Sequence, residues 1–154
     1  MNVVMIGAGY VGLVSGACFA EFGANVTCLD VDAGKIAALQ SGNIPIYEPG
    51  LEELVHSNMQ AGRLQFSTQF QDWIADADLV FIAVGTPTRR GDGHADLSYV
   101  YAAAEDIADR INGYTVIVTT VEPDACAASI VQDLTALPST WMTQAPHCDV
   151  SQPT

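Results

Sequence analysis

Short, mostly apolar stretches alternate with amphipathic segments along the chain. The clearest stretch is DLVFIAV at 78–84, whose unbroken apolar run is typical of a strand in a parallel sheet covered on both faces. Further stretches of this kind are predicted as strands at 2–6, 25–29, 63–67 and 114–120. The segments between and after them predict helices at 10–22, 32–40, 51–59, 70–77, 97–111 and 124–136.

Local signals define several helix ends. Gly23 follows the first predicted helix, where glycine is favoured, and Asp32 is placed to cap the second. The alternation of strands and helices predicts the α/β class, as a Rossmann-like, doubly wound parallel sheet with helices on both faces. We expect this domain to span residues 1–137 and residues 138–154 to form an irregular tail.

A G-x-G-x-x-G pattern lies between the first predicted strand and the first predicted helix. In this context Gly7 permits a tight turn, Gly9 lets the backbone approach a pyrophosphate, and Gly12 lets the helix pack close to the strand. The pyrophosphate is expected at the helix start, where Tyr10 and Val11 lie, bound by backbone N–H groups and the helix dipole. The alternative is a glycine-rich turn that binds no ligand.

Asp30 ends the second predicted strand. A carboxylate at that position accepts hydrogen bonds from the adenosine ribose and repels the 2′-phosphate of NADP, so the pattern predicts NAD as the cofactor. Lys35, one turn into the next helix, is expected to reach the same ribose edge. The alternative for Asp30 is to cap the following helix, a role that Asp32 can also fill. The alternative for Lys35 is a solvated side chain without a ligand.

The sequence Gly85, Thr86, Pro87 follows the apolar strand at 78–84. Ligands of open α/β sheets bind beyond the carboxyl ends of the strands, so this segment is predicted to lie along the dinucleotide. Gly85 would leave room for the dinucleotide, and the Thr86 hydroxyl would form a hydrogen bond with it. The alternative interpretation is an ordinary turn.

Composition narrows the possible partners. The formal net charge is −13, with 5 Lys and Arg against 18 Asp and Glu, which opposes binding to nucleic acid and to anionic membranes. The chain has no apolar run long enough to span a bilayer, and we expect it in the cytoplasm. Because the net charge also repels anionic ligands, a phosphate site has to rely on local backbone dipoles.

Cysteine and histidine residues give no sign of a metal centre or a catalytic group. No CxxC pair is present, so we predict no metal site, and the histidines have no triad-like or metal-like spacing. Cys18 and Cys28 are predicted to be buried packing residues. Cys126 and Cys148 have nearby acidic residues and no glycine-rich approach, so neither is predicted to be a nucleophile.

Four segments carry a resemblance to a known family: the N-terminal VVMIGAGYVGLVSGACFAEFGANVTCLDVDAGKI, then SGNIPIYEPGLEELV, ADLVFIAVGTPT and DGHADLSYVYAAAEDI. Together they resemble the UDP-glucose 6-dehydrogenases of the UDP-glucose/GDP-mannose dehydrogenase family, collinearly from Met1 to about Thr119. The resemblance implies an enzyme that oxidises the C6 alcohol of UDP-glucose to UDP-glucuronate with two NAD, through a thiohemiacetal on a cysteine. It also implies a nucleotide-sugar substrate and a dimer in the full-length family.

The resemblance assigns Val11 and Gly12 to the pyrophosphate loop, Asp30 and Lys35 to the ribose site, and Thr86 to the turn against the dinucleotide. It stops where the family has its catalytic cysteine motif and sugar domain, for which this chain has no counterpart. We therefore expect no catalytic residue here and no activity of this chain alone. The alternatives are a non-catalytic NAD-binding module, a piece of a GDP-mannose or UDP-N-acetylmannosamine dehydrogenase, or a remnant that folds poorly.

The segment IPIYEPGL at 44–51 is the most specific part of the resemblance. Pro45 and Pro49 each fix a backbone angle, and Gly50 allows the chain to enter the next helix. Glu48 is expected to cap that helix. We interpret the segment as a stiff wall of the scaffold and assign no chemistry to it.

Overall fold

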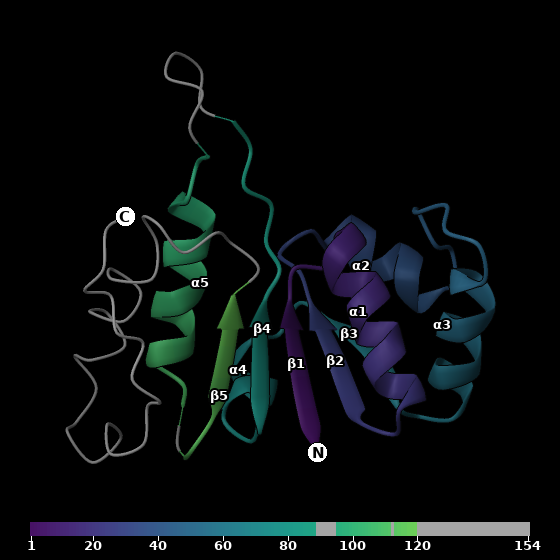
Figure 1. The fold of residues 1–154 in the computed structure, drawn as a ribbon, viewed down its shortest axis with the longest axis horizontal. Helices are drawn as coiled ribbons and strands as arrows, with labels where there is room; N and C mark the ends of the chain where they lie inside the picture. Colours follow the sequence, from purple (N-terminus) through teal and green to yellow (C-terminus); the bar gives the residue numbers. More distant parts are fainter. Residues whose placement is uncertain (89–94, 112, 120–154) are drawn as a thin grey trace, which may run out of the picture.

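The computed structural model describes residues 1–88, 95–111 and 113–119. Five parallel strands form one sheet in the order β3-β2-β1-β4-β5 (Figure 1). The strands are β1 (Asn2–Ile6), β2 (Asn25–Leu29), β3 (Leu64–Ser67), β4 (Leu79–Ile82) and β5 (Val116–Thr119). The helices are α1 (Tyr10–Glu21), α2 (Ala33–Gln40), α3 (Leu51–Gln60), α4 (Gln71–Ile74) and α5 (Ser98–Ala108).

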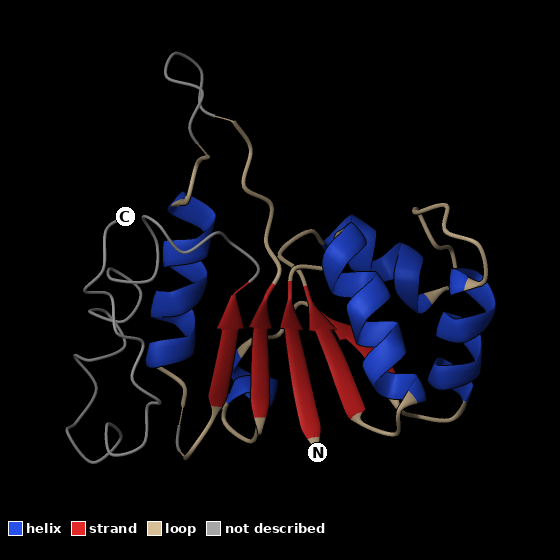
Figure 2. Cartoon of the chain, viewed as in Figure 1, coloured by secondary structure: helices blue, strands red, loops and turns tan. Residues whose placement is uncertain are grey.

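The strand order places a topological switch at β1. The chain leaves β1 towards β2 and β3, and later returns to place β4 on the other side of β1. Loops on the two sides of the switch diverge, which leaves a crevice at the carboxyl ends of the strands. Those ends lie together at the upper edge of the sheet in Figure 2.

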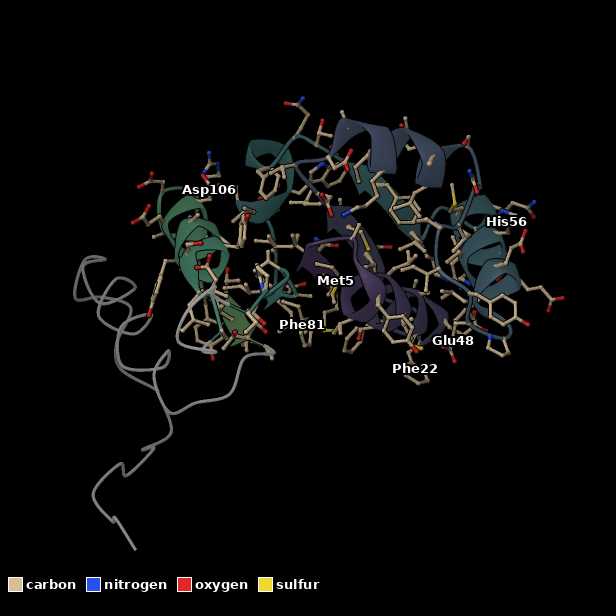
Figure 3. The ribbon with its side chains drawn as sticks, turned by 90° about the horizontal axis from the view of Figure 1, so that it is seen from above. Met5, Phe22, Glu48, His56, Phe81 and Asp106 are labelled. Carbon is tan, nitrogen blue, oxygen red and sulfur yellow. The ribbon has the colours of Figure 1, made fainter. Side chains whose placement is uncertain are left out.

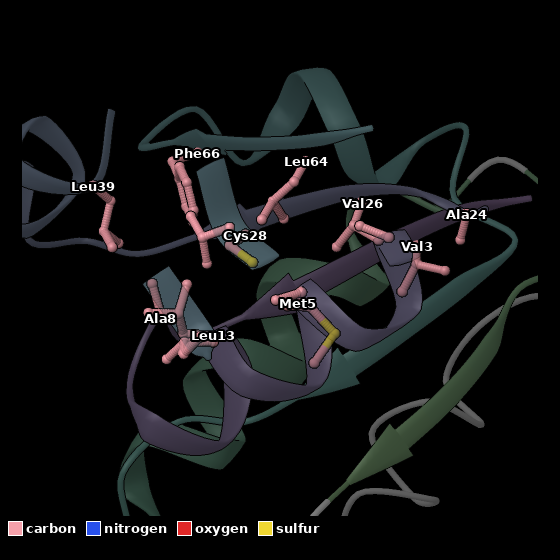
Figure 4. Packing of buried hydrophobic residues seen from close by; sticks show 14 of the residues in the cluster. Val3, Met5, Ala8, Leu13, Ala24, Val26, Cys28, Leu39, Leu64 and Phe66 are labelled. Atoms are coloured by element: carbon pink, nitrogen blue, oxygen red, sulfur yellow. The ribbon is translucent and has the colours of Figure 1, made fainter. Parts of the chain in front are cut away.

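Alternating side chains along β1 pack into two separate cores, one on each face of the sheet. Val3 and Met5 point to the first core, and Val4 and Ile6 to the second. Helices α1, α2 and α3 complete the first core, which Figure 4 shows from close by. Helices α4 and α5 complete the second. The predicted doubly wound sheet with helices on both faces is therefore confirmed.

Element bounds agree most closely where the signals are local. The strands predicted at 2–6 and 25–29 match β1 and β2. Gly23, with φ of 93°, directly follows Phe22, the C-cap of α1, so a glycine closes this helix as predicted. Asp32 caps α2 through hydrogen bonds from the N–H groups of Gly34 and Lys35. The helix predicted at 70–77 is shortened to Gln71–Ile74, and the one at 97–111 to Ser98–Ala108.

Several predictions fall beyond these residues. The helix predicted at 124–136, the domain end at 137 and the tail at 138–154 lie outside the part of the chain that the structure describes.

Three predictions are wrong in detail. Strand β4 was predicted to be covered on both faces, but Leu79 and Phe81 are only half-buried. On the side of α1 they lie at the margin of the first core, where the rings of Phe81 and Phe19 are 5.1 Å apart. Cys18 is exposed, because the buried stripe of α1 runs along the other side of that helix. Glu48 does not cap α3, whose N-cap Gly50 has φ of 81° and no side-chain cap hydrogen bond.

Candidate functional site

The turn after β1 needs glycine for steric reasons. Gly7 has φ of 103°, a left-handed conformation that other residues rarely adopt, and its N–H donates to the Leu29 carbonyl at 2.7 Å. A Cβ on Gly7 would lie 2.6 Å from the Ala83 carbonyl oxygen. The turn is thus pinned between the ends of β2 and β4, at the topological switch.

The other two glycines of the pattern differ in their surroundings. A Cβ on Gly12 would overlap the Gly7 carbonyl oxygen, so this glycine lets α1 pack against the turn. A Cβ on Gly9 would meet nothing within 4 Å. The space in front of Gly9 is open, and the first N–H groups of α1, which have no partners within the helix, lie beside it. These are the features that a bound diphosphate requires.

Asp30 lies at the end of β2 and is only 8% exposed. Its Oδ2 accepts hydrogen bonds from the Ala8 N–H at 2.9 Å and from Lys35 Nζ at 2.7 Å, and its Oδ1 accepts from the Asp32 N–H at 3.0 Å. Burial raises the pKa of Asp30, but the hydrogen bonds from Lys35, Asp32 and Ala8 outweigh it, so the pKa lies below its ordinary value. The carboxylate is therefore ionised at neutral pH and fixed in orientation.

These groups border one cavity of about 430 Å³ at the carboxyl ends of β1, β2 and β4. Among the residues predicted from the sequence, the cavity is lined by Gly7, Gly9, Asp30, Lys35, Gly85 and Pro87. Its remaining wall is largely apolar and comes from both sides of the switch. This wall consists of Ile6, Leu29, Val31, Phe70, Ala83, Val84, Tyr99, Ala102, Ala103 and Asp106.

Four predicted site residues do not line the cavity. Gly12 is buried beneath the turn, and Thr86 is half-buried in the segment after β4. Val11 and Tyr10 have exposed side chains at the start of α1, where their backbone N–H groups are the ones available to an anion. The Tyr10 hydroxyl instead donates a hydrogen bond to Glu48 Oε2 at 2.6 Å.

Sequence reasoning missed the wall formed by α5. Tyr99, Ala102, Ala103 and Asp106 recur at the spacing of one helix face, but this periodicity was equally compatible with ordinary core packing. Figure 3 shows Asp106 on α5, on the opposite side of the molecule from α3. Phe70 enters from the segment before α4, and no local pattern signalled its position.

The cavity has the chemistry that a dinucleotide requires. Its glycine turn and helix start offer N–H groups to a diphosphate, Asp30 offers acceptors to a ribose diol, and the apolar wall can receive a planar base. The absent Cβ at Gly9 leaves the approach to the helix start free. The residues present therefore fit NAD.

Comparison with known proteins gives the same result. The model of the NAD-binding domain of the UDP-glucose/GDP-mannose dehydrogenase family matches residues 1–145. The chain belongs to this family.

Relatives within the family share both sequence and fold. UDP-glucose 6-dehydrogenase of Rhizobium meliloti (strain 1021) is 64% identical over 119 residues, which cover 77% of this chain and 27% of that protein. A ternary complex of GDP-mannose dehydrogenase from Pseudomonas aeruginosa has a TM-score of 0.80 and 33% identity, covering 89% of this chain and 32% of that one. UDP-glucose dehydrogenase from Pyrobaculum islandicum has a TM-score of 0.78 and 35% identity, covering 88% of this chain and 32% of that one.

The chain thus corresponds to the cofactor domain of these dehydrogenases and spans under a third of the length of the relatives named above. The family's cofactor is NAD. In the described part of this family member, no group of His, Cys, Asp and Glu side chains could hold a metal ion. No helix in the same part is both long and apolar enough to cross a membrane.

Proposed function

We propose that this chain is the NAD-binding part of a UDP-glucose 6-dehydrogenase, which oxidises UDP-glucose to UDP-glucuronate in two hydride transfers to NAD. Support comes from the family match and from the 64% identity to the Rhizobium meliloti enzyme. GDP-mannose dehydrogenase shares the fold at 33% identity, and UDP-N-acetylmannosamine dehydrogenases share it at 26–29%. The second candidate function is therefore oxidation of one of these two nucleotide sugars.

The observation that carries the proposal is the position of Asp30 relative to the glycine turn. Its carboxylate is hydrogen-bonded to the Ala8 N–H, inside the G-x-G-x-x-G loop, and lines the same cavity as Gly7 and Gly9. A diphosphate on the loop therefore brings its neighbouring ribose to a fixed, ionised acceptor. That carboxylate opposes a 2′-phosphate, so the site favours NAD over NADP.

Each part of the site has a defined task in this proposal. The N–H groups at the start of α1 hold the diphosphate, and Asp30 accepts hydrogen bonds from ribose hydroxyls. Lys35 holds the Asp30 carboxylate in place at 2.7 Å. Phe70, Tyr99 and the small residues of α5 exclude water from the base. NAD supplies the hydride acceptor when bound.

We assign no catalytic residue to this chain. Cys28 is buried in the first core, and burial raises the pKa of its thiol to about 12, which makes a thiolate rare at neutral pH. Cys18 lies exposed on α1 and does not line the cavity. The proposal places the sugar site and the nucleophile in the parts of the relatives that this chain does not span. Free thiols at Cys18 and Cys28 suit the reducing cytoplasm, which we propose as its location.

Equilibrium titration with NADH and with NADPH, followed by nicotinamide fluorescence, tests the proposal. The expected result is saturable binding of NADH and binding of NADPH that is weaker by about tenfold or more, a difference of ~1.4 kcal/mol. A folded, monodisperse chain that binds neither dinucleotide would contradict the proposal. Equal binding of both would remove the assigned role of Asp30.

A further inference from the structure

The segment IPIYEPGL is not part of the cavity wall, yet it contacts the start of the cofactor-binding helix. Glu48 Oε2 accepts a hydrogen bond from the Tyr10 hydroxyl at 2.6 Å, across 38 positions of sequence. Tyr10 is the first residue of α1 and directly follows Gly9. Figure 3 shows Glu48 on the side of the molecule where α1 and α3 lie.

The segment is firmly attached to the rest of the domain. Ile44 and Ile46 are half-buried and pack against the first core, while the intervening Pro45 faces solvent. The Leu51 N–H donates to the Glu48 carbonyl at 3.1 Å, and the Leu51 side chain is only 3% exposed. The segment is therefore anchored on both sides of Glu48, and its prolines restrict the backbone further.

Helix α1, by contrast, lacks a side-chain cap at its first turn. Its N-cap is Gly9, which has no side chain, and no acidic residue lies in the first turn. The Tyr10 side chain is 54% exposed, so packing holds it only in part. The bond to Glu48 ties the first residue of α1 to a stiff, anchored segment.

We infer that Glu48 is a positioning residue for the dinucleotide: through the Tyr10 hydroxyl it holds the start of α1 in the geometry that binds the diphosphate. This inference rests on the proposed function. Preorganised N–H groups bind an anion better than groups that must first be ordered. Segment 44–51 then restricts the movement of the glycine loop and of the start of α1.

The sign of the effect separates this role from general electrostatics. The chain is strongly acidic, so removal of any nearby carboxylate should favour an anionic ligand. Glu53, exposed in the first turn of α3, provides the matched control. It borders the same surface hollow as Glu48, but among the described residues the Tyr10 hydroxyl is hydrogen-bonded to Glu48 and not to Glu53. If Glu48 positions the loop, Glu48→Ala weakens binding while Glu53→Ala leaves it unchanged or strengthens it.

The experiment measures NADH dissociation constants for the 154-residue chain and its variants. Glu48→Ala and Tyr10→Phe should each weaken NADH binding by about 3- to 10-fold, the range that one net hydrogen bond provides. The double variant should be no weaker than either single one, because both remove the same contact. Glu48→Gln should restore part of the affinity, since its amide oxygen can accept the phenol proton.

Two competitors locate the effect within the ligand. ADP-ribose contains the diphosphate and adenosine lacks it, so Glu48→Ala should weaken displacement of NADH by ADP-ribose and leave that by adenosine unchanged. Three results would overturn the inference. The first is an equal loss of displacement by ADP-ribose and by adenosine, and the second is an additive loss of NADH affinity in the double variant. The third is a Glu48→Ala chain that binds NADH as Glu53→Ala does. If Glu48→Ala fails to fold, Tyr10→Phe gives the same comparison. Failure of the unsubstituted chain to bind NADH would overturn the proposed function, and this inference with it.

Discussion

The Nζ atom of Lys35 lies 2.7 Å from the Oδ2 atom of Asp30, at the carboxyl end of β2. The same oxygen accepts the Ala8 N–H of the glycine turn. This pair therefore joins the beginning of α2 to the glycine turn. Because Lys35 and two N–H groups bind the carboxylate, Asp30 is held in place before any ligand arrives.

Replacement of Asp30 should reduce both affinity and selectivity. Asp30→Ala should weaken NADH binding by about 10- to 100-fold, the range for hydrogen bonds to a charged group, and should narrow the gap to NADPH. Asp76→Asn is the control, because this exposed residue lies before the amino end of β4, whereas the cavity lies at the carboxyl ends of the strands. Fluorescence titration of both variants checks the prediction. An unchanged NADH-to-NADPH ratio in Asp30→Ala would count against the ribose role.

Stability should depend on the ionisation of Asp30 in acid. Its pKa is lower in the folded chain than the ordinary value of about 3.9, so the unfolded chain binds more protons at acidic pH. The stabilisation is present above the ordinary pKa and is lost as pH falls through the folded pKa. Urea unfolding at a series of pH values should show a shallower acid loss for Asp30→Asn than for the unsubstituted chain. Parallel profiles would contradict this origin.

Two glycines of one motif should fail in different ways. Gly12→Ala places a Cβ against the Gly7 carbonyl and should lower the free energy of unfolding by about 1–3 kcal/mol. Gly9→Ala meets open space at φ of −81°, so stability should change by no more than about 0.5 kcal/mol. That same Cβ lies where a diphosphate approaches, and NADH binding should fall by about tenfold or more. Thermal unfolding and titration of both variants separate the two effects.

The two described cysteines should differ in reactivity. Cys18 is exposed, whereas Cys28 is fully buried, and burial raises the pKa of its thiol to about 12. A thiol reagent added to the native chain should label Cys18 and spare Cys28 until urea unfolds the protein. Peptide mapping by mass spectrometry after labelling gives the answer. Rapid native labelling of Cys28 would mean that the first core opens readily.

Local patterns predicted much of the site. Gly7 and Gly12 are required by steric contacts within one turn, and the spacing to Asp30 follows from one strand and one helix. Lys35 does lie beside Asp30, in an ion pair, and its place at the ribose edge stays a prediction. Such features depend on residues that are close in sequence or linked by a single βα unit.

Long-range features could not be predicted in this way. Phe70 and Tyr99 meet at the cavity only because the sheet brings together the segments that follow β3 and β4, which lie on opposite sides of the switch. The bond between Tyr10 and Glu48 depends on how α1 and α3 pack, which no periodicity encodes. The half-buried side of β4 was missed because an apolar run does not show which helix covers it.

The position of the NAD site is tested most directly by amide chemical-shift perturbation, with NADH added to the ¹⁵N-labelled chain. We expect saturable shifts at Gly9, Tyr10 and Val11, at Asp30, and at Gly85, with little change in α3. Tight binding with shifts confined to α3, or spread evenly over the sheet, would contradict the claim that this cavity is the NAD site.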